Sequence, residues 1–340
     1  KNKIKINMKT TIKKNKLQLI VFLILGSLPL FIDSYYLDNI SYFMCWTFIS
    51  LGLAVIWGMG GILSFGQTAF FGLAGYGFSV ISINFLGVAG VSLWSIVLAL
   101  IITGIFGVIV GYFLFYGGIY DVFIGIVTLA ITLVFETFMQ QTAGPEYVIG
   151  KARLNGFNGM QGMPTIGFEN IPYGLVEGIT QYYFILLISI IILISLYKFK
   201  NSKMGLIFLA SKEDRERVSS LGHNVQKIQL IAFTIASVLA GISGILYTNW
   251  GGYITPDSMG LVSAALPVVY VAASGKKDFF SVFIGCIFFV WLSQTLAING
   301  KQFAIIVMGL ILVISTRFFP DGIILMLKNK LIEKIKWLQY

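Results

Sequence analysis

The stretch KFKNSKMGLIFLASKEDRERVSSLGHNVQK, residues 198–227, decides the fold class of this chain, because it is a strongly charged loop between two apolar segments. It contains seven Lys and Arg residues, and the apolar segments 182–197 and 228–250 flank it. Most of the other positive charge lies in three further stretches: 1–16, Lys276 with Lys277, and the residues from Arg317 onward. Together the four stretches contain 21 of the 24 Lys and Arg residues.

Apolar spans separate these four basic stretches. Cytoplasmic loops of membrane proteins accumulate Lys and Arg, so the pattern predicts a polytopic membrane protein with both termini in the cytoplasm. The composition agrees, with 57% hydrophobic residues, 11% charged residues and a mean hydropathy of +0.87. The net charge is +10. Because the basic residues flank apolar spans, this charge favours contact with anionic membrane lipid over a nucleic-acid partner.

A helix needs about 20 apolar residues to cross the bilayer. By this criterion we expect an all-α protein with about ten transmembrane helices (eight to ten). The candidate spans are 17–32, 40–57, 66–86, 91–116, 119–142, 182–197, 228–250, 261–274, 279–297 and 303–319. The domains expected are a basic tail 1–16, a membrane domain 17–325 and a basic tail 326–340, with 143–181 outside and 198–227 inside.

Two of these spans are weak. Residues 261–274 contain Pro267, and residues 58–77 contain seven glycines together with Ser64 and Gln67. Irregular backbone at membrane depth persists only where protein or a water-filled cavity satisfies its polar groups. Either segment could therefore be broken or re-entrant.

Small residues recur on two helix faces, at Gly104, Gly107 and Gly111 and at Ala240 and Gly244. Such faces let helix backbones approach closely. They are expected either to pack inside one bundle or to meet a partner subunit.

The inventory of reactive side chains is poor. Cys45 and Cys286 lie in apolar spans, and His223 is the only histidine, so we expect no catalytic residue and no metal site. Gly275-Lys276 lacks the earlier glycine of a phosphate-binding loop. Glu136 is an ionisable side chain inside an apolar span. An intramembrane carboxylate is a candidate for the transport path, although near a helix end it can also reach the membrane interface.

Loop 198–227 predicts a short helix over 206–221 with an apolar and a charged side. A helix lying on lipid would favour a cationic face. Here Glu213, Asp214 and Glu216 mix with three basic residues, which favours a protein partner.

Five motifs, in their order along the chain, resemble those of the inner-membrane permeases of branched-chain amino acid ABC importers. The motifs are LSFGQTAFFGLAGY at 63–76, GIYDVF with IVTLA at 118–130, GFNGMQGMP at 156–164, YITPDS at 253–258 and FPDG at 319–322. AFTIASVLAGISG at 232–244 follows the charged loop, in which Glu216 and Gly222 keep the E-x5-G spacing of the ATPase-docking loop. ASGKKD at 273–278 replaces the family's glycine-rich turn, so permeases for urea and short amides remain an alternative.

The resemblance implies a bacterial inner-membrane, multi-pass subunit that is not itself an enzyme. It further implies a second homologous permease, two cytoplasmic ABC ATPases that carry ATP and Mg²⁺, and a periplasmic substrate-binding protein, with no cofactor in this chain. We expect Glu213, Arg215, Glu216 and Gly222 to contact the ATPases, with Gly222 ending the helix in a left-handed conformation. An ion-coupled carrier or channel is the alternative of another class.

The substrate path is expected beside the glycine-rich segment, at Ser64, Gly66, Gln67 and Thr68, together with Glu136. Hydroxyl, amide and backbone groups there can bind a small zwitterion, although the glycines can also serve only close helix packing. In the outer loop, Asn155, Asn158 and Pro164 are expected to contact the binding protein.

Overall fold

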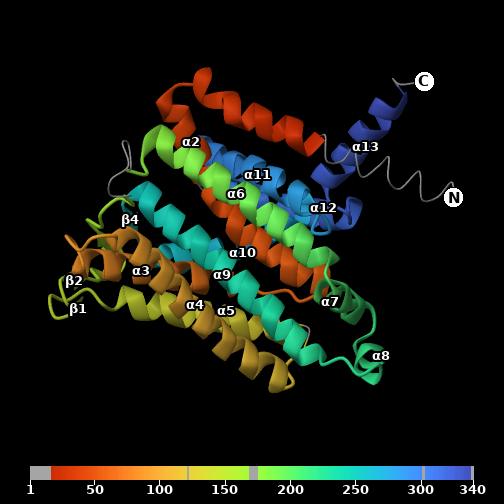
Figure 1. Cartoon of the computed structure of the whole chain (residues 1–340), viewed down its shortest axis with the longest axis horizontal. Coiled ribbons are helices and arrows are strands. Elements are labelled where there is room, and N and C mark those ends of the chain that lie inside the picture. Colours follow the sequence, from red (N-terminus) through yellow and green to blue (C-terminus); the bar gives the residue numbers. More distant parts are fainter. Residues whose placement is uncertain (1–16, 121, 168–174, 301–302, 338–340) are drawn as a thin grey trace.

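The computed structural model describes residues 17–120, 122–167, 175–300 and 303–337. It is a bundle of helices with four short strands at one end (Figure 1). The basic tail 1–16 lies outside the described residues.

Each of the ten predicted spans coincides with a helix. After the N-terminal helix Leu17–Leu30 come α2 (Ser34–Leu53), its π-helical continuation (Ala54–Met59), α3 (Gln67–Asn84), α4 (Val91–Tyr116), α5 (Val122–Gln140), α6 (Gly178–Asn201), α9 (Val225–Gly251), α10 (Leu261–Ser274), α11 (Phe279–Gly300), α12 (Phe303–Phe318) and α13 (Ile323–Trp337). Six helices of the described residues are long and apolar enough to cross a membrane, or seven if α12 and α13, which meet at a bend of 54°, form one span.

Helix α9 lies in the middle of the bundle and packs against α2, α3 and α4 (Figure 1). Small residues permit this packing, because a Cβ on Gly244 would overlap the backbone of Phe71 and one on Gly107 would press on Ser237. The small-residue faces predicted on α4 and α9 are therefore used inside the chain.

The loops gather at two ends, as the alternation of spans requires. At one end, β3 (Met160–Gln161) pairs with β4 (Tyr253–Ile254), and Asn84 Nδ2 donates to the Ile149 carbonyl at 2.7 Å, beside the hairpin of β1 (Val148–Ile149) and β2 (Ala152–Arg153). At the other end, Lys200 Nζ donates to the Lys277 carbonyl at 2.7 Å. We call these the outer and inner ends, after the orientation that the charge distribution predicts.

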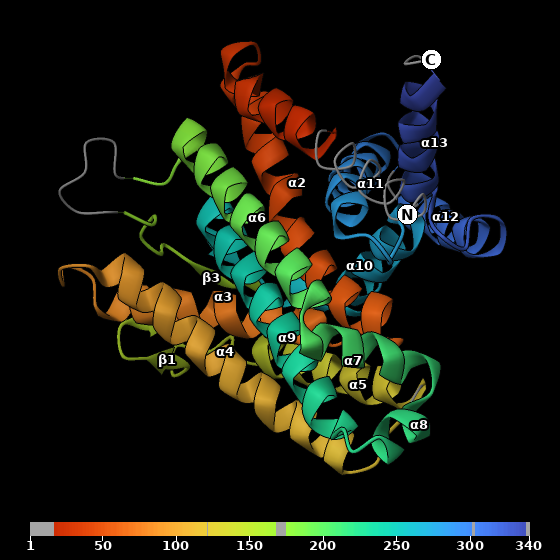
Figure 2. The ribbon, with the colours of Figure 1, turned by 45° about the vertical axis from the view of Figure 1, so that its right-hand side comes forward.

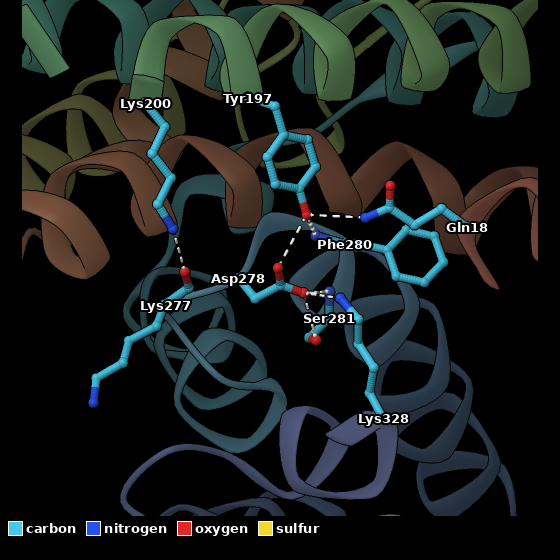
Figure 3. A network of polar contacts seen from close by, with 8 residues as sticks. All are labelled: Gln18, Tyr197, Lys200, Lys277, Asp278, Phe280, Ser281 and Lys328. Carbon is cyan, nitrogen blue, oxygen red and sulfur yellow. Dashed lines mark hydrogen bonds and ion pairs between the residues drawn. The ribbon is translucent and has the colours of Figure 1, made fainter. Parts of the chain in front are cut away.

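At the inner end, a buried ion pair ties the C-terminal helix to the bundle (Figure 3). Lys328 Nζ of α13 contacts Asp278 Oδ2, and each side chain is only 5% exposed. The Tyr197 hydroxyl of α6 donates to Asp278 Oδ1 at 3.0 Å, and Ser281 Oγ donates to Asp278 Oδ2 at 2.8 Å. The sequence predicted 326–340 as a basic tail, but its residues up to Trp337 continue the helix α13.

The turn around Asp278 explains the charged replacement in ASGKKD. Gly275 has a φ of +114°, and the Gly322 backbone of the FPDG motif packs directly against it, since a Cβ on Gly322 would overlap Gly275. Lys277 pairs with Asp321 across the same contact. The two motifs thus form one joint between α10, α11 and α13.

Replacing Lys328 by methionine is expected to destabilise the chain, because a buried Asp278 without its cation costs about 3–5 kcal/mol. Thermal unfolding of the purified protein in detergent, followed by size-exclusion chromatography, should give a lower Tm for Lys328→Met. Lys330→Met, at an exposed position of the same helix, is the matched control. Equal Tm values for the two variants would contradict a structural role for the pair.

Candidate functional site

The helical path between α2 and α3 is interrupted. The π-helical turn ends at Met59, Gly61 has a φ of +75°, and α3 begins only at Gln67. The sequence predicted a broken segment within 58–77, and the structure confirms a break but confines it to residues 60–66, between the π-helical turn and α3. From Gln67 onward the chain is helical despite its further glycines.

Glycines in and beside this broken segment permit contacts that a side chain would prevent. A Cβ on Gly58 would overlap the carbonyl of Lys276, and one on Gly60 would overlap the ring of Phe208. At Gly66, a Cβ would lie 2.8 Å from that of Thr128. Lys276, Phe208 and Thr128 belong to three different elements, and all three contact the backbone of residues 58–66.

Helix α5 satisfies the backbone of the break. The Phe65 amide donates to Thr128 Oγ1 at 3.2 Å, and Thr132 Oγ1 donates to the Phe65 carbonyl at 3.3 Å. These threonines lie roughly 9–15 Å along α5 from its inner end, at 1.5 Å per residue. The break is thus inside the bundle, where its polar groups need protein partners. Sequence reasoning missed Thr128 and Thr132; their signal is a polar i, i+4 pair in an apolar span.

The four path residues predicted around the break lie next to one another, and their polar side chains are buried. Gln67 is 3% exposed and Thr68 is 1% exposed. Within the described chain, three side-chain atoms have no hydrogen-bond partner: Nε2 and Oε1 of Gln67 and Oγ1 of Thr68. Ser64 differs, since its Oγ accepts from the Gly66 amide at 3.2 Å. Buried polar atoms without partners are uncommon in proteins, so these three atoms call for an explanation.

Glu136 is not beside Gln67 but farther toward the outer end. It continues the α5 face of Thr128 and Thr132, about 6 Å beyond Thr132 along the axis. Its Oε1 accepts from Gln140 Nε2 at 3.3 Å and lies against Gly260. The carboxylate of Asp257 is close enough to act on it electrostatically.

Beside Glu136, the short helix η4 (Pro256–Met259) packs against α3 and α5. The Met259 thioether fills the space over Gly72, where a Cβ would overlap it. The Tyr76 hydroxyl lies one turn above; it is buried and has no hydrogen-bond partner in the described chain. Polar residues thus recur along both α3 and α5 between the outer end and the break, and Met259 packs on α3 at Gly72.

On the inner side, the charged loop packs directly on the break. Helix α7 (Lys203–Glu213) places Phe208, which is fully buried, against Gly60. Lys212 Nζ donates to the Gly58 carbonyl at 3.2 Å. From the α10–α11 turn, Lys276 Nζ lies 4.5 Å from the Trp57 ring centroid. Burial and the neighbouring charges of Lys212 and Lys277 lower the pKa of Lys276.

The prediction of a single helix over 206–221 is wrong. Asp214 has extended backbone (φ −156°, ψ 101°), so the loop contains α7 and a second helix, α8 (Arg215–Ser220). Asp214 Oδ1 accepts from the Arg217 amide at 2.9 Å and so caps α8. Aspartate is favoured at the N-cap of a helix and disfavoured in its interior, which is the physical reason for the split. Gly222 does have the predicted left-handed conformation, with φ +84°.

The predicted coupling residues fall into two groups. Glu213, Glu216 and Gly222 are exposed, together with Leu206 and Leu221, which are 56% and 72% exposed. Arg215 instead turns toward the bundle, with its guanidinium 4.2 Å from the Tyr120 ring centroid in the α4–α5 turn. Figure 2 shows α7 and α8 together at the inner end of the bundle.

In the outer loop, Asn155 is half-buried in the left-handed conformation (φ +66°), Asn158 is exposed and Pro164 is half-buried. Phe157, between the two asparagines, is 66% exposed and was missed from the sequence. The loop is fixed from below by Asn249, whose Oδ1 accepts from the Ile166 amide at 2.7 Å. The described residues contain no cluster of three metal-ligating side chains.

Comparisons with known proteins place these features in a family. The chain is 24% identical over 334 residues to the high-affinity branched-chain amino acid transport system permease protein LivM of Escherichia coli K12, covering 94% of this chain and 77% of the relative. It is 23% identical, with the same coverage, to LivM of Salmonella typhimurium LT2. A probable LivM of Methanocaldococcus jannaschii is 24% identical over 68% of this chain and 67% of its own length.

No solved structure matches the chain. The model of the family described as the permease component of branched-chain amino acid transport systems matches residues 35–316, which include the break, α5, η4 and the charged loop. The chain is therefore a multi-pass membrane protein that belongs to the permease family of branched-chain amino acid ABC transport systems.

Proposed function

We propose that this chain is the permease subunit of an ATP-driven importer, which moves branched-chain or related small amino acids across the bacterial inner membrane. A second homologous permease, two cytoplasmic ABC ATPases with their ATP and Mg²⁺, and a periplasmic binding protein complete the assembly. The names of the LivM relatives support this function. The observation that carries it is the packing of α7 on the broken segment, which links an exposed charged surface to a site inside the bundle.

The exposed surface is suited to a protein partner. Leu206 and Leu221 expose apolar area beside Glu213 and Glu216. Apolar contacts with a rim of mixed charge are typical of docking surfaces between proteins. We therefore assign ATPase docking to Glu213, Glu216 and Gly222. Arg215 has a different role, because its stacking on Tyr120 fixes α8 to the α4–α5 turn.

Coupling then requires that ATPase closure favour one conformation of the permease pair over another. A displacement of α7 moves Phe208 away from Gly60 and Lys212 away from the Gly58 carbonyl. Both contacts are made to the backbone that precedes Ser64, so a displacement of the docked loop changes the path residues without a long chain of intermediates.

The path itself runs, in this proposal, along the facing residues of α3 and α5. Its lining is almost uncharged, and Glu136 is the single carboxylate of α5. Uphill ion-coupled carriers use several ionisable groups inside the membrane. This shortage favours an ATP-driven permease over the alternative of an ion-coupled carrier or channel.

The assembled importer tests this function. Proteoliposomes with both permeases, both ATPases and the binding protein should accumulate radiolabelled leucine only with ATP, and should not do so when the second permease is left out. Uptake by this chain alone, driven by a sodium or proton gradient, would establish a secondary carrier. ATP-driven uptake of urea in place of amino acids would establish the amide branch of the family.

Glu216→Lys is expected to uncouple transport, because it reverses the charge of an exposed side chain on the proposed docking surface. Binding-protein-stimulated ATP hydrolysis and uptake should both fall by about tenfold or more, as for a lost charged contact at an interface. Glu333→Lys, a charge reversal at another exposed glutamate, on α13, is the control. Normal uptake in Glu216→Lys importers would remove Glu216 from the docking surface.

Gly66→Leu is expected to block transport, because the new side chain would press on Thr128 and disturb the hydrogen bonds that α5 makes to Phe65. Uptake should be lost while co-purification of the ATPases is kept. Gly309→Leu, on α12 with open space around it, should transport normally. If Gly66→Leu also transports normally, the break is not part of the path.

A further inference from the structure

We propose that the first turn of α3, with the side chains of Gln67 and Thr68, forms the subsite that binds the carboxylate group of an amino-acid substrate. This inference rests on the proposed function and adds to it the residues that bind the substrate carboxylate and the orientation of the bound substrate. Two independent observations lead to it: buried polar atoms without partners, and a helix that begins inside the bundle.

The first observation concerns the two side chains. Gln67 and Thr68 are 97% and 99% buried, yet three of their polar atoms have no hydrogen-bond partner within the described chain. Leaving a buried donor or acceptor unpaired is unfavourable. Nothing in the packing requires a polar residue at either position, because leucine and valine would fill similar volumes. A ligand that uses these groups explains their presence.

The second observation concerns the backbone. Helix α3 has 18 residues and starts at Gln67, beside residues of α5 that lie well inside that helix. The first N–H groups of a helix have no partner within it and carry a partial positive charge. Near this start, the Gly66 amide donates to Ser64 Oγ and the Ala69 amide to the Gly66 carbonyl. The backbone amides of Gln67 and Thr68 lie between those of Gly66 and Ala69 in the chain, and they belong to the first N–H groups of α3.

The charges nearby favour a carboxylate over an ammonium group at this point. A broken helix whose N-terminus points into a membrane protein can bind an anionic group without any basic side chain. Lys212 donates to the Gly58 carbonyl, on the far side of the break. Glu136 lies farther out on the same α5 face as Thr128 and Thr132, so its negative charge repels a carboxylate and attracts an ammonium group. A zwitterion is thus oriented with its carboxylate at α3.

This subsite separates amino acids from the neutral amides that related permeases carry. Urea and short amides have no negative charge to gain from the N-terminus of α3. The ligand class is therefore an α-amino acid with a free carboxylate. The apolar side chains around the break leave the choice among such amino acids to packing.

The test is equilibrium binding to the complete permease–ATPase complex in nanodiscs, without the binding protein, so that only the membrane site is measured. Radiolabelled leucine is the probe, and leucinamide, which has the ammonium group but no carboxylate, is the competitor. The wild type should prefer leucine by about tenfold or more, the value of one charge-assisted hydrogen bond. In Gln67→Leu and Thr68→Val, leucine affinity should fall and the preference should shrink toward one.

Gln181→Leu is the matched control, since Gln181 on α6 is also a buried glutamine, and its side-chain nitrogen has no hydrogen-bond partner among the described residues. It should keep the leucine preference. Thr68→Val is nearly isosteric and decides the matter if Gln67→Leu does not assemble. An unchanged preference in both variants, or a wild type that binds leucine and leucinamide equally or neither, would overturn the subsite. ATP-driven leucine uptake by the same complex, measured with the binding protein, shows separately whether the proposed function holds.

Discussion

Backbone polar groups inside a membrane protein must find partners within the protein, and the segment between α2 and α3 depends on this constraint more than any other part of the chain. A continuous helix would satisfy its own N–H and C=O groups. The break at 60–66 gives up that arrangement, and side chains provide hydrogen-bond partners instead: Thr128 and Thr132 of α5 at Phe65, Ser64 Oγ at Gly66, and Lys212 at the preceding Gly58 carbonyl.

These partners come from parts of the chain that have different roles. The α5 threonines belong to the line of polar residues that leads to Glu136 at the outer end, whereas Lys212 belongs to the loop that we assign to ATPase docking. The partners that stabilise the irregular backbone are therefore also the elements that would move it. In the proposed mechanism, a stable bundle and a movable path would therefore not need separate sets of residues.

The general architecture could be predicted from the sequence, because long apolar runs between basic loops leave few alternatives to a helical bundle. The position of the break could also be predicted, since glycine density with Ser64 and Gln67 is unfavourable for a lipid-facing helix. The contacts that complete the site could not. Thr128 and Thr132 resemble ordinary threonines that bond to their own helix, and only tertiary structure shows that they face Phe65.

Two further differences have the same origin. Charge counting assigned Lys328 to a tail, but its partner Asp278 lies 50 residues earlier in the chain, and single-sequence patterns do not reveal such a pair. Periodicity predicts one helix over 206–221, and only the structure shows that Asp214 separates two helices and caps the second. Local patterns identify which segments are helical, while the exact ends depend on caps and distant partners.

In the proposed importer, the glycines also link the substrate site to the ATPase-docking loop. Because no side chains project at positions 58, 60 and 66, α7, the α10–α11 turn and α5 all contact one short run of peptide groups. A substrate that orders the start of α3 then acts on the same backbone that α7 holds. Linkage between two binding events is reciprocal, so if docking changes the affinity for substrate, substrate must change the affinity for docking by the same factor. A continuous helix in place of the break would keep α7 and the start of α3 apart, and the coupling between the two binding events would be weaker.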